Sequence, residues 1–78
     1  MQRRVMNMLG MIINEQELQE LEYMIKKEMD ELIFDMEDTR IDLVVKKAMY
    51  DRYQTLFQLF RRVANDHEVQ KYMTNYKF

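Results

Sequence analysis

The sequence contains no cysteine, serine, proline or tryptophan, and it has one glycine and one histidine. Without cysteine the chain can form neither a disulfide nor a thiolate metal site. The only aliphatic hydroxyl groups belong to Thr39, Thr55 and Thr74, so the common nucleophiles are scarce. One glycine cannot build a glycine-rich loop that cradles phosphate. These absences argue against most catalysis, and we expect no enzyme activity, no cofactor and no bound metal ion.

The remaining polar clusters are better explained by structure than by chemistry. His67, between Asp66 and Glu68, is typical of a solvated residue at a helix boundary rather than of a general base. The Glu-x-x-His pair of helical di-iron sites is absent, because Ala64 stands three residues before the histidine. Residues 35–42, DMEDTRID, lack the glycine and glutamate positions of an EF-hand loop, so helix capping is the preferred interpretation.

What the sequence does contain is typical of helices. Of 78 residues, 33% are charged and 47% are apolar, which predicts a single small all-α domain over residues 1–78. A core of this size is marginal on its own, and a second subunit is the stabilising device that remains. Nine methionines fit ordinary core filling best, and an adaptable apolar surface is the alternative.

The clearest local signal predicts a helix over about residues 15–37. Asn14 followed by Glu17 is a capping box, and Glu15 adds a second anion in the first turn. An apolar stripe with steps of three and four follows, formed by Leu18, Leu21, Ile25, Met29, Leu32 and Met36.

A second helix is predicted over about residues 40–64. Thr39 with Asp42 forms a weaker capping box, and Asp38 is an alternative cap. At about 100° per residue, the apolar stripes of the two segments differ in phase by roughly 140°. One straight helix would therefore carry two unrelated apolar faces, so we predict an antiparallel two-helix hairpin that turns between Met36 and Asp42.

Short terminal helical segments could flank the hairpin. Asn65 with Glu68 could cap a helix over residues 66–76, or the second helix could simply continue. Residues 3–12 could form a further short helix, although Gly10 weakens that pattern.

Charge is segregated between the two long segments. Residues 15–38 carry a net charge of −8 and residues 40–64 a net charge of +4. The charges could complement each other within the hairpin or across a dimer, or one charged face could bind an external partner. The possible phosphate contacts of a nucleic-acid-binding protein are Lys46, Lys47, Arg61 and Arg62.

An apolar arc on the second helix is wider than one neighbouring helix can cover. Its members, the expected partner or dimer interface, are Tyr50, Tyr53, Phe57, Leu59 and Phe60. Two hairpins that pack together through this arc would form a homodimeric four-helix bundle. The alternative is a monomer completed by the terminal segments, through Leu9, Ile12, Tyr72 and Met73.

We therefore expect a non-catalytic helical protein–protein interaction module, an adaptor or regulatory protein that self-associates and binds a protein of unknown identity. A small nucleic-acid-binding regulator that uses the basic second helix is the alternative. No run approaches the roughly 18 apolar residues of a membrane span. The lack of cysteine fits a reducing compartment, so we expect a cytoplasmic location.

Overall fold

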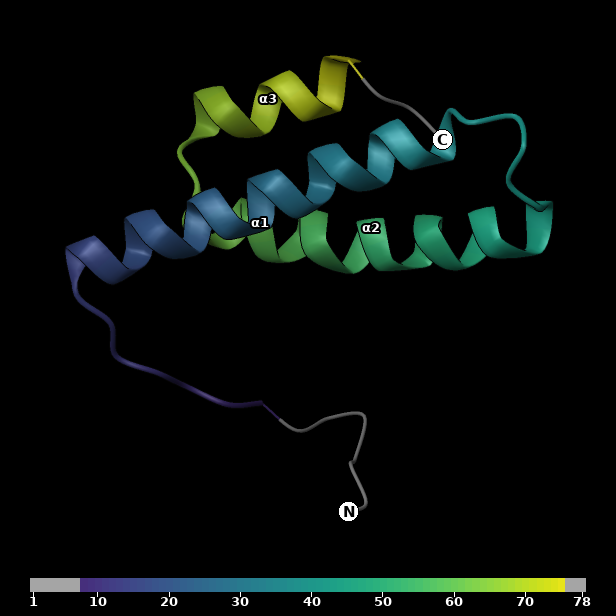
Figure 1. Cartoon of the computed structure of the whole chain (residues 1–78). Helices are drawn as coiled ribbons and strands as arrows, with labels where there is room; N and C mark the ends of the chain where they lie inside the picture. Colours follow the sequence, from purple (N-terminus) through teal and green to yellow (C-terminus); the bar gives the residue numbers. More distant parts are fainter. Residues whose placement is uncertain (1–7, 76–78) are drawn as a thin grey trace.

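Three helices make up the described part of the chain (Figure 1). The structure is a computed structural model that describes residues 8–75, with the side chains of residues 8–73. The helices are α1 (Glu15–Met36), α2 (Leu43–Val63) and α3 (Asp66–Asn75), and residues 8–75 contain no strand. α1 and α2 run antiparallel beside each other, and α3 turns back along α2. The predicted all-α helical hairpin is confirmed.

The start of α1 follows from the predicted capping box. The Asn14 side-chain oxygen accepts a hydrogen bond from the Glu17 backbone N–H at 2.8 Å. In return, the Glu17 carboxylate accepts one from the Asn14 N–H at 3.0 Å. Two backbone donors that the first helical turn cannot satisfy are thus paired, which fixes where the helix begins.

The start of α2 differs from the prediction by three residues. The Asp38 carboxylate accepts hydrogen bonds from the Arg40 backbone N–H at 2.9 Å and from its guanidinium at 2.8 and 3.0 Å. This local turn holds Arg40 outside the helix. Asp42 then becomes the cap, and its carboxylate accepts from the Val44 N–H at 3.4 Å. Neither Thr39 nor Asp38 caps α2.

The core lies where all three helices meet. Its buried side chains are Ile25, Met29 and Leu32 from α1, Tyr53 and Phe60 from α2, and Val69 and Tyr72 from α3. Met29 and Phe60 are 0% exposed. The rings of Phe60 and Tyr72 meet edge to face with centroids 5.4 Å apart, a favoured aromatic geometry. α3 is therefore part of the fold and not an appendage.

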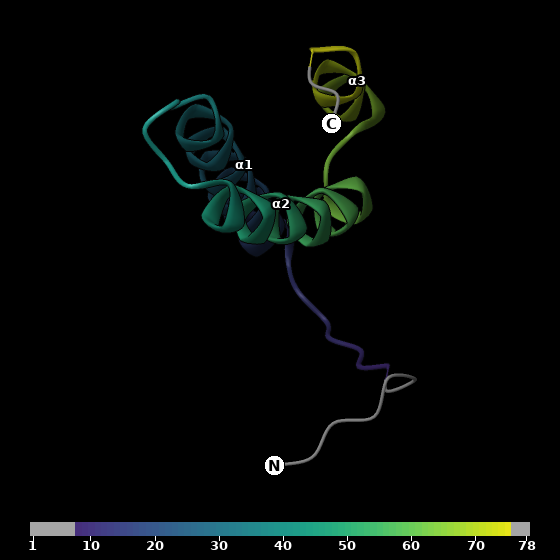
Figure 2. The same ribbon diagram turned by 90° about the vertical axis from the view of Figure 1, so that its right-hand side faces the viewer.

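The two ends of the chain behave differently. α3 begins after Asn65, whose side chain accepts from the Glu68 N–H at 2.9 Å, as the sequence pattern predicts. Residues 8–14, by contrast, are not helical, and residues 3–7 of the possible N-terminal helix lie outside the described residues. In the views of Figures 1 and 2 this segment leads away from the helices. Met8, Leu9, Met11 and Ile12 are consequently exposed.

Candidate interaction surfaces

The five residues predicted as a partner or dimer interface do not form one surface. Tyr53 and Phe60 are buried in the chain's own core, because α1 and α3 cover the side of α2 that carries them. Phe57 is half-buried and stacks on Tyr53 with ring centroids 6.3 Å apart. Tyr50 is half-buried, and Leu59 is 37% exposed. Tyr50 and Leu59 lie nine residues apart, which places them on opposite sides of α2.

The predicted phosphate contacts are also separated. Lys46 and Lys47 lie in the first turns of α2, whereas Arg61 and Arg62 lie in its last turn. At about 1.5 Å per residue, roughly 23 Å separates Lys47 from Arg62 along the helix. Lys47 also forms an ion pair with Asp51 at 3.5 Å. The fold does not gather these cations into a single basic patch.

A cluster of polar side chains joins α1 to α3. The Lys26 ammonium forms an ion pair with Glu68 at 2.8 Å, and Lys71 approaches the same carboxylate at 3.2 Å. Hydrogen bonds from these two lysines hold the pKa of Glu68 below its usual value. The bond to Glu68 in turn raises the pKa of Lys26. The Tyr72 hydroxyl donates to the Asp30 carboxylate at 2.6 Å.

This cluster stabilises the fold and is poorly suited to catalysis. Burial and then the bond to Asp30 raise the pKa of the Tyr72 phenol far above its ordinary value, so it stays protonated as a donor. A general base needs a pKa close to the working pH. The pKa of Glu68 is lowered and that of Lys26 is raised, so both are moved away from that pH. His67 is exposed. Among the described residues, no group of three or more His, Asp or Glu side chains is placed to hold a metal ion.

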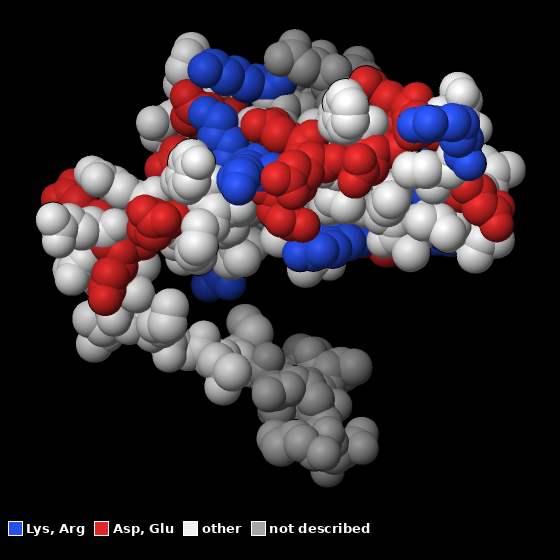
Figure 3. Space-filling view, in the orientation of Figure 1, with Lys and Arg blue, Asp and Glu red and all other residues white. Residues whose placement is uncertain are grey.

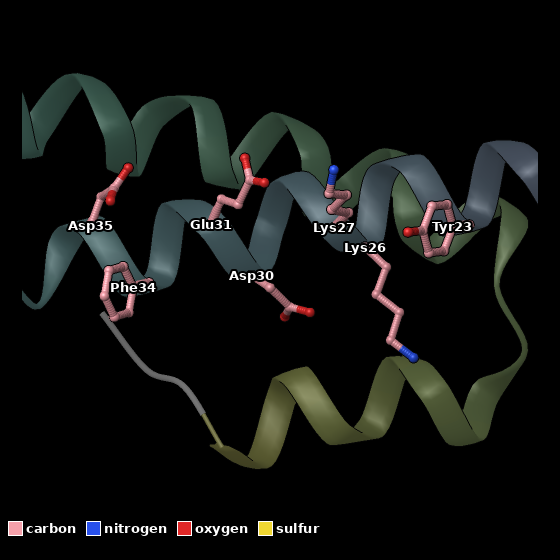
Figure 4. A pocket seen from close by; sticks show the side chains of 7 residues that line it. All are labelled: Tyr23, Lys26, Lys27, Asp30, Glu31, Phe34 and Asp35. Carbon is pink, nitrogen blue, oxygen red and sulfur yellow. The ribbon is translucent and has the colours of Figure 1, made fainter.

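A hollow lies along α1 (Figure 4). Its volume is about 650 Å³, and we call its lining the outer α1 face: Tyr23, Lys26, Lys27, Asp30, Glu31, Phe34 and Asp35. Lys26 and Asp30 point towards α3, while Tyr23 and Phe34 stand near the two ends of the row. Phe34 is 75% exposed, so most of its ring faces solvent. Acidic side chains gather over α1 in Figure 3.

Two further hollows flank the bundle. The first has a volume of about 380 Å³ and lies where the N-terminal segment meets α1; it is lined by Met11, Ile12, Ile13, Glu17, Glu20, Leu21 and Met24. The second, of about 540 Å³, lies at the turn of the hairpin and is lined by Met36, Leu43, Lys46, Lys47 and Tyr50. Leu43 and Val44 beside it are each at least 75% exposed.

These surfaces were not predicted from the sequence, although a signal was present. Phe34 falls outside the apolar stripe of α1. An apolar residue out of phase with the buried stripe has to face solvent or a partner, which is the signal that could have identified it.

The chain matches no protein-family model, no curated protein and no solved structure. Within the described part of the chain, no helix has the length and apolar character that crossing a bilayer requires.

Proposed function

We propose that this chain is a non-catalytic helical interaction module, an adaptor or regulatory protein that self-associates in the cytoplasm. One observation carries the proposal: seven large apolar side chains are at least three-quarters exposed on this small domain. They are Met8, Leu9, Met11, Ile12, Phe34, Leu43 and Val44. Four of them follow closely on one another in the N-terminal segment, and a cluster of exposed apolar side chains of this kind marks a protein-binding site in soluble proteins.

The free energy gained by burying these apolar side chains supports binding. Burying one Leu, Ile, Phe or Met side chain that would otherwise face water is favourable by about 1.5–3 kcal/mol. Three or four such residues supply about 4.5–12 kcal/mol. That is of the same order as the cost of the lost freedom of a second molecule, about 4–15 kcal/mol. Two polar contacts join α3 to α1, namely Lys26 with Glu68 and Asp30 with Tyr72. Because these groups hold the fold together, they offer no obvious catalytic centre.

A dimeric four-helix bundle remains a form that self-association could take. α3 already covers the side of α2 that carries Phe60, since Tyr72 packs on that ring. Two hairpins would therefore have to meet through the side that α3 leaves open, or through the exposed residues at their ends. A closed two-fold arrangement satisfies both copies with the same contacts.

Mass in solution tests self-association directly. Light scattering at tens of micromolar should give a mass near twice the 9.8 kDa of one chain. A mass that stays at one chain at every concentration would contradict self-association. Affinity purification from the native cell then tests the adaptor role, and recovery of nucleic acid in place of a specific protein would favour the alternative function.

A further inference from the structure

The N-terminal segment and the outer α1 face have complementary chemistry. Residues 1–14 contain Arg3 and Arg4 and no acidic residue. The outer α1 face carries Asp30, Glu31 and Asp35 against Lys26 and Lys27, a net charge of −1, within a helix whose net charge is −6. Both surfaces also expose large apolar groups: Met8, Leu9, Met11 and Ile12 on the segment, and Tyr23, Met24 and Phe34 on α1. An apolar, acid-free segment matches an acidic helix that carries exposed aromatic side chains.

The outer α1 face has the length of such a segment. It runs from Tyr23 to Asp35, which is roughly 18 Å along the helix at about 1.5 Å per residue. Residues 8–13 in extended form span about 20 Å, which is close to that length.

The chain's own segment does not line the outer α1 face. Met11, Ile12 and Ile13 line the smaller hollow instead, and Met11 and Ile12 remain 76% and 100% exposed. The segment leads away from the bundle in both views (Figures 1 and 2). Every chain carries one segment and one outer α1 face. Two copies related by a two-fold axis can therefore satisfy each other with two identical contacts.

We propose that the N-terminal segment of one copy, residues 8–13, docks along the outer α1 face of a second copy in a two-fold exchange. This inference rests on the proposed self-association and specifies the surface that carries it. Leu9 and its apolar neighbours pack between Tyr23 and Phe34 of the other copy, and the acidic side chains of α1 attract the basic end of the chain.

Charge variants of one exposed residue test the docking. Leu9→Glu should weaken self-association about tenfold or more, because an apolar contact is lost and an anion is brought to an acidic face. Leu9→Lys loses the same apolar contact without the repulsion, so it should weaken association less. On a Glu31→Lys background the difference between the two variants should shrink or reverse. Sedimentation equilibrium gives the dissociation constants.

Val44→Glu is the matched control, since Val44 is also apolar and 75% exposed but lies on α2, outside the outer α1 face. It should leave the dissociation constant unchanged. Circular dichroism should show unaltered helix content in every variant, because none of the changed residues is buried. If Val44→Glu disrupts the dimer and Leu9→Glu does not, this inference fails while self-association stands. A wild-type chain that stays monomeric overturns both this inference and self-association.

Disulfide trapping separates docking on a second copy from docking within one chain. The chain has no cysteine, so Leu9→Cys and Phe34→Cys can be placed in separately tagged chains. After mild oxidation, the mixture should contain a disulfide-linked pair of different tags. The double variant in one chain should also give linked dimers. Crosslinking only within single chains would overturn the choice of a second copy as the occupant.

Discussion

Phe60→Ala should strongly destabilise the protein. Phe60 is 0% exposed and packs edge to face on Tyr72, so it joins α2 to α3 at the centre of the core. Truncating a buried phenylalanine to alanine costs about 3–5 kcal/mol, because apolar burial is lost and a cavity remains. At about 0.05–0.15 kcal/mol per residue, a chain of 78 residues has a total stability of roughly 4–12 kcal/mol. The variant therefore loses between about a quarter and all of its stability.

Urea unfolding followed by circular dichroism measures this loss. Leu59→Ala is the matched control, because Leu59 is the adjacent residue and is 37% exposed, and its truncation should cost about 1 kcal/mol. Phe60→Leu, which keeps most of the volume, should cost less than Phe60→Ala and so remain measurable if the alanine variant does not fold. Equal losses for Phe60→Ala and Leu59→Ala would refute the placement of Phe60 in the core.

Protein concentration gives the same experiment a second readout. If Phe60 belongs to the core of a single chain, its truncation lowers the stability by the same amount at every concentration. If it instead lay in a dimer interface, the difference from the wild type would grow with concentration, because only the wild type would gain stability from association.

Three further predictions concern the contacts that fix the helix ends and α3. Tyr72→Phe removes the donor to Asp30 and should lower the urea-unfolding free energy by about 1–2 kcal/mol; no change would contradict that hydrogen bond. Because Lys26 holds the pKa of Glu68 below its ordinary 4.5, the ion pair contributes stability above that pH and loses it as the pH falls through the lower folded value. Stability measured in acid should therefore fall less steeply in Glu68→Gln, and an unchanged slope would count against the pair. Asn14→Ala should cost about 1 kcal/mol and reduce helix content at the start of α1, whereas Asn14→Asp should cost little.

The fold could be predicted wherever a signal is local. Asn14 and Glu17 lie three residues apart and fix the start of α1 without help from the rest of the chain. The α1 stripe through Ile25, Met29 and Leu32 is buried as its period predicts. The start of α2 was less predictable because Asp38, Thr39 and Asp42 are all competent caps. Which one is used depends on the turn that Asp38 forms with Arg40.

The placement of α3 was only partly predictable, because its contacts are remote in sequence. Lys26 with Glu68 and Asp30 with Tyr72 are each separated by 42 residues, and no periodicity links them. The sequence left two possibilities open for the wide apolar arc of α2, a second copy or the terminal segments. In the structure the C-terminal segment covers Phe60, through Tyr72, while the described part of the N-terminal segment covers none of the core.

The methionines show why the proposed interaction surface could not be predicted from the sequence. Core filling was the favoured explanation of their number, and Met29 does fill the centre of the core while Met36 and Met49 pack around it. Others face solvent, namely Met8, Met11, Met24 and Met73. Composition cannot separate the two groups, because both use the same flexible thioether chain. An exposed methionine side chain stays flexible, so Met8, Met11 and Met24 can adjust to the shape of a partner. The proposed exchange of the N-terminal segment uses Met8 and Met11, and its specificity then has to come from the charge of α1.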